Sequence, residues 1–248
     1  MHAIILAAGY ATRMYPLTEN TPKPLLRVGD KSIVDHIIEK IPKEVKKIHI
    51  VTNAKFYNQF KVWQKNKKNI SIVNDATTSN EARLEGIGDI LLTIKGKKID
   101  DDLLIIAGDN LFEFDLQKML DMFKEKNTPI IAASDLKDKS LLAKRFGVIQ
   151  IGKSDKMIGF EEKPENPKTK LAATACYVIP KTHIPKLRQY TKEIKEKKNL
   201  GYFIIWLMQK EPVHAVVFKE PWYDIGNLEE YNKLKQIYKY LVKNSKQS

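Results

Sequence analysis

The sequence predicts an α/β fold in which a mixed, mainly parallel sheet is flanked by helices. Through the first half of the chain, short apolar runs alternate with segments whose apolar residues recur at a helical period. Several apolar runs end in glycine or polar residues, as strands do where their carboxyl ends form a binding site. From Arg145 onward the apolar runs follow one another more closely, which predicts antiparallel strands. The expected architecture is therefore a Rossmann-like sheet with a small antiparallel addition over the site.

The length and composition fit one globular domain. The chain has 248 residues, and 43% of them are hydrophobic, which is enough for one large α/β domain with a substantial core. No apolar run approaches the roughly 20 residues needed to span a bilayer. Cys176 is the single cysteine, so no internal disulfide can form. We therefore expect one domain over residues 1–248, located in the cytoplasm and without a membrane contact.

The chain is strongly basic, with a formal net charge of +13. Such a charge suits anionic ligands, nucleic acid among them. The lysines, however, are scattered through mixed-sign segments such as KEIKEKK at 192–198, and the sequence contains no recognisable nucleic-acid-binding motif. We interpret the charge as a lysine-rich solvated surface and expect no nucleic acid partner.

Strands and helices alternate at the start of the chain. The apolar run Ala3–Ala8 meets Gly9, which predicts a buried strand that ends in a turn. The next elements are expected at Ser32–Ile41 (helix), Ile48–Thr52 (strand), Lys55–Lys67 (helix) and Ile70–Val73 (strand). This alternation favours a parallel sheet.

The later elements follow from the same two periodicities. Thr78 and Glu81 match a capping box that would open a helix continuing to Ile94. Beyond it, elements are expected at Asp102–Ala107 (strand), Leu116–Phe123 (helix), Pro129–Ala133 (strand), Phe146–Ile151, Met157–Pro164 and Thr169–Pro180 (three strands), Leu187–Lys198 (helix), Phe203–Met208 (helix), Val213–Phe218 (strand) and Leu228–Val242 (helix).

The turn after the first strand has the composition of a phosphate-binding loop. Gly9, Ala11 and Thr12 allow a bound group to approach the backbone, whose N–H groups can face an anion. Arg13 adds a planar fork of donors suited to phosphate oxygens, and Lys23, between two prolines, adds a second cation. The segment lacks both G-x-x-x-x-G-K-[ST] and G-x-G-x-x-G, so a kinase or dehydrogenase loop is not indicated.

One carboxylate stands where a cation could bind. Asp109 follows the Asp102–Ala107 strand directly, beside Gly108, and a carboxylate there can coordinate a hard cation without burying an unpaired charge. The acidic run 100–102 precedes the same strand, at the opposite end of the sheet. We interpret that run as a solvated turn and Asp109 as the first candidate metal ligand.

The amino-terminal segment resembles a known family. It carries Gly9, Thr12-Arg13, Tyr15-Pro16-Leu17-Thr18 and Pro22-Lys23-Pro24-Leu25-Leu26. This combination is similar to the signature of the sugar-1-phosphate nucleotidyltransferases, also called nucleotide-sugar pyrophosphorylases. The resemblance implies Mg²⁺-dependent transfer of a nucleoside monophosphate from a nucleoside triphosphate to a sugar 1-phosphate, with release of pyrophosphate. Many members have glycine where this chain has Ala11.

The resemblance also implies a role for each motif residue. About residues 1–135 would bind the nucleotide and about 136–248 the sugar phosphate. Catalytic roles are implied for Arg13 and Lys23, and Mg²⁺ would be held by Asp109 and by Asp224, which lies in a W-x-D-x-G-T-like motif with Asn227 in place of Thr. Nucleotide binding is implied for Ala8, Gly9, Tyr10, Ala11, Thr12, Arg13, Lys23, Asn80 and Gly108. Sugar-phosphate binding is implied for Gly147, Glu162, Lys163 and Tyr177.

Two departures leave the substrates open. Where thymidylyltransferases have a Gln-containing base-reading loop, this chain has Asn80, whose amide carries both a donor and an acceptor. Family members often have Asn-x-Gly or Thr-Gly near Thr174, and here Ala175 stands in that place. The base, the sugar and the oligomeric state, including a homo-oligomer, are not decided by the sequence.

Three other functions compete with this prediction. A cytidylyltransferase could act on a phosphorylated alcohol such as phosphocholine, with Tyr177, Trp222 and Tyr223 forming a cation–π cage. An inactive nucleotide-sugar-binding regulatory protein would keep the fold without the reaction. A nicotinamide-dependent oxidoreductase would need the glycine motif that the chain lacks.

Overall fold

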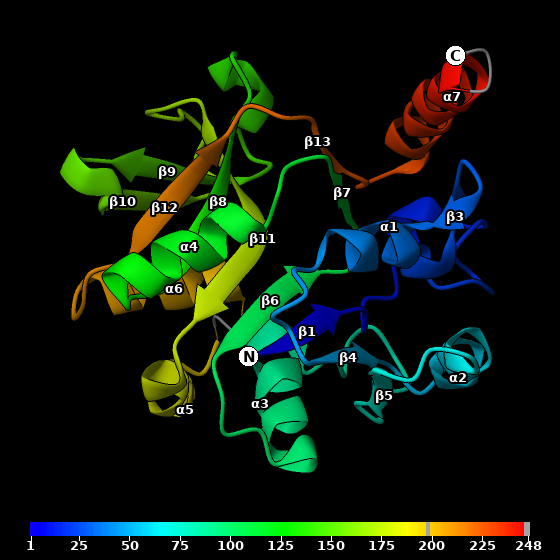
Figure 1. Cartoon of the computed structure of the whole chain (residues 1–248), viewed down its shortest axis with the longest axis horizontal. Coiled ribbons are helices and arrows are strands. Elements are labelled where there is room, and N and C mark those ends of the chain that lie inside the picture. The colour runs from blue at the N-terminus through cyan, green and yellow to red at the C-terminus, as the bar shows by residue number, and fades with distance from the viewer. Residues whose placement is uncertain (197–198, 246–248) are drawn as a thin grey trace.

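The computed structural model describes residues 1–196 and 199–245 of the chain (Figure 1). The strands are β1 (His2–Leu6), β2 (Arg27–Val28), β3 (Lys31–Ser32), β4 (Lys47–Thr52), β5 (Ile70–Asn74), β6 (Leu103–Ala107), β7 (Asn110–Phe112), β8 (Ile130–Asp135), β9 (Gly147–Ile151), β10 (Met157–Glu162), β11 (Leu171–Ile179), β12 (His214–Phe218) and β13 (Trp222–Asp224). The helices are α1 (Ile33–Lys40), α2 (Tyr57–Gln64), α3 (Glu85–Lys97), α4 (Gln117–Lys126), α5 (Ile184–Glu193), α6 (Leu200–Met208) and α7 (Leu228–Ser245).

Nine of these strands form one sheet. Its path is β10-β9-β11-β6-β1-β4-β5, with β8 beside β11 and β12 beside β8. The strands β6, β1, β4 and β5 are parallel, as the early strand–helix alternation predicts. Strand β9 is antiparallel to both of its neighbours, β10 and β11. They therefore match the expected antiparallel strands but continue the main sheet rather than forming a separate layer.

Helices cover both faces of the sheet, so the α/β prediction is confirmed (Figure 1). On β1 the side chain of Ile5 enters one core and that of Ile4 the other, because successive strand residues point to opposite faces. The first core contains buried residues of α1, α2, α4 and α7, and the second contains those of α3, α5 and α6. No helix within the described ranges is long and apolar enough to cross a membrane.

The capping-box prediction is wrong. Helix α3 begins at Glu85, after a turn at Glu81–Ala82, and its N-cap residue Leu84 makes no side-chain capping bond. The hydroxyl of Ser79, not that of Thr78, accepts a bond from the N–H of Ala82, at 3.3 Å. Because the hydroxyl of Ser79 closes a turn here, the segment before Glu85 is a loop, and its residues Asn80 and Arg83 line a cavity.

Two other predicted boundaries differ in detail. The helix expected at Leu187–Lys198 is α5, which begins earlier and ends at Glu193; residues 197–198 lie outside the described part of the chain. The strand expected at Thr169–Pro180 is β11, but it contains a register shift between Ala173 and Tyr177. The first part of β11 pairs with β9 and the last part with β6, so the sheet divides at this point.

Candidate functional site

Two adjoining cavities open at the carboxyl ends of β1 and β6. The loop cavity, about 520 Å³, is lined mainly by residues 6–13, Lys23, Asn80 and the start of α3. The hairpin cavity, about 740 Å³, is lined by the β9–β10 hairpin, the start of α6 and β13. Eight residues line both cavities: Leu6, Arg13, Gly86, Ala107, Asp109, Lys163, Asn199 and Gly226. The site therefore has two chambers joined at Asp109, which suits two substrates.

The structure brings all nine predicted nucleotide-binding residues to the loop cavity. The turn is held by side chains behind it: the hydroxyl of Thr18 donates to the carbonyl of Ala11 at 2.8 Å, and the amide of Asn53 donates to that of Ala8 at 3.0 Å. Ala11 itself is left-handed, with φ 48°. Ala11 therefore adopts a backbone conformation that glycine adopts more readily than alanine.

Gly108 lies in the turn after β6, where the chain passes close to the end of β1. Its N–H donates to the carbonyl oxygen of Leu6 at 2.8 Å, and a Cβ at this position would lie 2.7 Å from the same oxygen. A side chain would therefore push apart β1 and the turn after β6. The glycine of the Gly-Asp-Asn sequence fixes the position of Asp109 beside the loop.

Lys23 reaches the junction of the two chambers from a buried position. It begins a short 3₁₀ helix, Lys23–Leu25, is 7% exposed, and donates from Nζ to Oδ2 of Asp109 at 3.0 Å. The flanking prolines restrict the backbone that carries it. Its partner carboxylate is 44% exposed. An anionic ligand at the junction can therefore meet an ammonium group that is already oriented.

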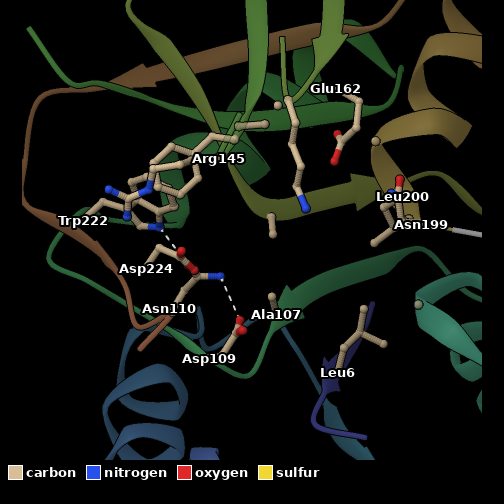
Figure 2. Close-up of a pocket in the computed structure, with 18 of the residues that line it drawn as sticks. Leu6, Ala107, Asp109, Asn110, Arg145, Glu162, Asn199, Leu200, Trp222 and Asp224 are labelled. Atoms are coloured by element: carbon tan, nitrogen blue, oxygen red, sulfur yellow. Dashed lines mark hydrogen bonds between the residues drawn. The ribbon is translucent and has the colours of Figure 1, made fainter. Parts of the chain in front are cut away.

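Asp109 and Asp224 are brought together by a small sheet. Strand β13 pairs with β7 so that Asp224 lies opposite Asn110, and the N–H of Ile225 donates to the carbonyl of Asp109 at 3.3 Å. The indole of Trp222 donates to Oδ1 of Asn110 at 3.1 Å, which fixes the pairing (Figure 2). Burial and the charge of Asp109 raise the pKa of Asp224 to about 6. The repulsion means that the pair would gain from a cation.

The donor set of these two residues fits a magnesium ion. Carboxylate oxygens are the hard ligands that Mg²⁺ prefers, and Mg²⁺ is commonly held by one or two carboxylates while phosphate oxygens and water complete its shell. Within the described residues, no cluster of three or more His, Cys, Asp or Glu side chains forms a complete protein cage. Asp109 and Asp224 would thus hold the ion together with a bound phosphate.

The hairpin cavity is built around Glu162. This carboxyl lies across the cavity from Asp109 (Figure 2), and no hydrogen bond from the described residues reaches it. Burial raises its pKa, while the charge of Lys163 opposes the rise. A Cβ on Gly147 would lie 3.3 Å from its Oε2, and one on Gly201 would lie 2.2 Å from it. Gly201 leaves room for this carboxyl, and Gly147 leaves room chiefly for the ring of Phe160, whose Cζ would lie 2.5 Å from a Cβ there. Glu162 is therefore an acceptor that is free to bind a ligand hydroxyl.

The division of the sheet creates the floor of this cavity. Ala175, with φ 56°, lies inside the register shift of β11, and Ala173, Ala175 and Tyr177 line the cavity. Bulges of this kind are frequent beside active sites because they redirect side chains. The hydroxyl of Thr174 donates to the carbonyl of Ala132 at 3.1 Å and is fully buried, so it serves the sheet. All four predicted sugar-phosphate residues line the hairpin cavity.

The sequence prediction missed several lining residues. Asn199 and Gly201 belong to the start of α6 and follow no motif. Arg145 pairs with Glu230 and lies over the ring of Phe146, 4.9 Å from its centroid. Arg145 could have been found from its position two residues before Gly147, which is itself a predicted site residue. Asp89 is a buried acid on α3, and its signal was a carboxylate on an apolar helical face.

The proposed aromatic cage is incomplete. Tyr177 and Trp222 line the hairpin cavity, but Tyr223 lines neither cavity within the described residues. The ring of Trp222 instead packs edge-on against Phe146, with centroids 5.1 Å apart. A cage needs several ring faces around one point, and these side chains do not supply it.

Comparison with known proteins gives a consistent result. The family model described as "Nucleotidyl transferase" matches residues 2–240. The bifunctional protein GlmU of Methanocaldococcus jannaschii is 31% identical over 228 residues, which is 91% of this chain but 51% of that protein. The glucose-1-phosphate adenylyltransferase of Geobacter metallireducens is 26% identical over 263 residues, covering 92% of this chain and 63% of the relative. The chain thus spans about half the length of the GlmU relative.

Solved structures share the fold. A Bacillus anthracis protein assigned as a glucose-1-phosphate thymidylyltransferase, in complex with a sucrose, superposes with a TM-score of 0.80 at 22% identity and covers 96% of this chain and 95% of its own. A UDP-glucose pyrophosphorylase complexed with UDP-glucose gives a TM-score of 0.77 at 22% identity, with 96% and 98% covered. At this identity the likeness establishes the fold.

Proposed function

The chain belongs to the nucleotidyl transferase family, and from this premise we propose that it transfers a nucleoside monophosphate from a nucleoside triphosphate to a sugar 1-phosphate. The observation that carries the proposal is the pair of chambers joined at Asp109, one beside a phosphate-binding turn and one around Glu162 and Lys163. The relatives named for GlmU and for glucose-1-phosphate adenylyltransferase support the same class of reaction.

The reaction needs no side-chain nucleophile. An oxygen of the sugar phosphate forms a bond to the α-phosphorus of the nucleotide, and the bond from that phosphorus to the bridging oxygen of pyrophosphate breaks. The attacking oxygen is already anionic, so the protein must align two anions and neutralise their charge. A buried, pre-oriented ammonium at the junction, Lys23, would meet the α-phosphate in the transition state. Arg13 would bind the pyrophosphate.

The acceptor substrate would occupy the hairpin cavity. Lys163 lines both chambers, so it would meet the phosphate of the sugar as a point charge. Glu162, unpaired among the described side chains, would accept hydrogen bonds from sugar hydroxyls. We expect Tyr177 and Gly147 to shape the same pocket. A hydroxyl-rich acceptor is favoured over phosphocholine, because the cavity contains a carboxyl that can bind hydroxyls and lacks a complete aromatic cage for a quaternary ammonium group.

We propose Mg²⁺ as the cofactor, held by Asp109 and Asp224. When bound, the ion neutralises charge on the nucleotide phosphates. Asp109→Asn should therefore weaken Mg²⁺-dependent nucleotide binding, and isothermal titration calorimetry with and without Mg²⁺ measures this. Unchanged metal-dependent affinity would remove Asp109 from the site. The cytoplasmic location, the single domain and the absence of nucleic acid and membrane partners stay predictions.

A substrate matrix tests the proposal. Five nucleoside triphosphates, each combined with a set of sugar 1-phosphates and with phosphocholine, are scored by pyrophosphate release in the presence of Mg²⁺. Release that depends on one sugar 1-phosphate supports the proposed reaction, and release with phosphocholine alone supports the rival acceptor. Tight nucleotide-sugar binding without any release would instead support the regulatory protein.

A further inference from the structure

A pair of buried carboxyl groups lies beside the loop cavity. Asp75 follows β5 directly and is 7% exposed, and Asp89 lies on α3 and is 5% exposed. Asp75 is well supported, because the N–H and the hydroxyl of Thr77 donate to it at 2.7 and 2.8 Å. Asp89 lacks such support, because its Oδ1 is fully buried and none of the described residues donates a hydrogen bond to it. An unpartnered buried carboxyl oxygen is costly.

The side chains of Asp75 and Asp89 are hydrogen-bonded to each other, and a bond between two carboxyl groups requires that one of them carries a proton. Burial and the neighbouring Asp75 raise the pKa of Asp89 to about 7, and burial also raises the pKa of Asp75. The bonds from Thr77 favour the charged form of Asp75, so the shared proton rests on Asp89. Asp89 is then a neutral acid that donates from its buried Oδ1 to Asp75, which leaves Oδ2 as the acceptor for a group in the loop cavity.

Asp89 shares the loop cavity with the groups that would bind phosphate, but it differs from them in being an acceptor. It lines the loop cavity with Tyr10 and Asn80 but does not line the hairpin cavity. Among the described residues, Asp75 is the charged neighbour that raises the pKa of Asp89, and no cation opposes the rise. Phosphate oxygens are acceptors and anionic, so they are unsuitable partners for an acceptor oxygen. A nucleoside N–H donor is suitable.

We propose that Asp89, held in place by Asp75, is a specificity-determining residue that accepts a hydrogen bond from an N–H group of the nucleobase in the loop cavity. The inference rests on the proposed function in one respect, that the loop cavity is the nucleotide chamber. A leucine, which branches at Cγ in the same way, would suit this apolar helical face without the cost of a buried acid. A buried polar group discriminates strongly, because an unsuitable base leaves it unpaired.

The test measures nucleotide binding rather than turnover. Affinities for ATP, GTP, CTP, UTP and dTTP are measured by calorimetry with Mg²⁺ and without sugar phosphate, for the wild type, Asp89→Leu and Asp89→Asn. The leucine variant removes the acceptor, while the asparagine variant keeps a donor toward Asp75 and an acceptor toward the ligand. Thr93→Val, one turn further along the same buried face, is the matched control.

We expect the wild type to prefer one base at least tenfold. In Asp89→Leu this preference should fall at least tenfold, whereas Asp89→Asn and Thr93→Val should keep it within about threefold. An unchanged preference in the leucine variant, an equal loss for all five nucleotides, or a loss in the asparagine variant as large as in the leucine variant would overturn the inference. If the wild type binds selectively but releases no pyrophosphate with any acceptor, the proposed function fails and the role of Asp89 stands.

Discussion

Replacing Gly201 by alanine should damage one half of the site and spare the other. A Cβ there would lie 2.2 Å from Oε2 and 3.1 Å from the carboxyl carbon of Glu162. The first distance is about 1 Å shorter than the ~3.3 Å at which carbon and oxygen normally meet, so the carboxyl must move. Because the displaced atoms are the end of a side chain, the protein should still fold. Alanine also suits helix α6 better than glycine, which offsets part of the strain.

The displacement should appear in the kinetics of the acceptor substrate. Hydrogen bonds to a charged group contribute about 1.5–3 kcal/mol each, so losing one should raise the KM for the sugar phosphate by roughly 10–100-fold. The KM for the nucleoside triphosphate should change less than threefold. Gly96→Ala is the control, since it is also helical and its Cβ would meet nothing within 4 Å. A folded Gly201→Ala variant with an unaltered KM for the sugar phosphate would refute the role of Glu162.

Three further predictions follow from the same contacts. Lys23→Ala should lower turnover by two to three powers of ten, about 3–4 kcal/mol, as loss of one preorganised donor does; near-normal steady-state turnover would exclude Lys23 from the reaction. Ala11→Gly should leave the free energy of unfolding unchanged or raise it by up to about 1 kcal/mol, since φ 48° favours glycine. Ala143→Gly, at φ −54°, should instead lower the free energy of unfolding by about 0.5–1 kcal/mol, with both variants measured by urea titration. Equal decreases in the two variants would contradict backbone strain at Ala11. Asp89 has a pKa of about 7 in the folded protein and 3.8 in the unfolded chain. Between these pH values the folded state binds more protons, so the free energy of unfolding should fall as the pH rises from 4 to 7. The full difference corresponds to about 4 kcal/mol; Asp89→Asn should flatten the slope, and a variant with the wild-type pH dependence of unfolding would disprove this.

Much of the site could be predicted because its residues follow directly from strand ends. Gly108 and Asp109 come just after β6, and Glu162 and Lys163 at the end of β10, so sequence position and place in the sheet coincide. The parallel half of the sheet could also be predicted, because its apolar strands alternate along the sequence with segments of helical period. Asp224 could be paired with Asp109 only through family resemblance, since the β7–β13 pairing that brings them together joins distant segments.

The missed features depend on tertiary contacts. An alanine gives no local signal for a left-handed backbone, so neither φ 48° at Ala11 nor the bulge at Ala175 could be deduced from residue type. Gly201 becomes important because a side chain from β10 occupies the space beside it. Asp89 did carry a signal, an acid within an apolar helical pattern, but its pairing with Asp75 depends on how α3 packs beside the end of β5.

Tracing the α-phosphate tests the central claim most directly. The protein is incubated with Mg²⁺, its preferred nucleoside triphosphate labelled at the α-phosphorus, and the sugar 1-phosphate that supports pyrophosphate release. The account predicts that the label enters a nucleotide sugar, in amounts equal to the pyrophosphate released, and that omission of the sugar phosphate abolishes both products. Label recovered as free nucleoside monophosphate, at a rate independent of the sugar phosphate, would contradict it.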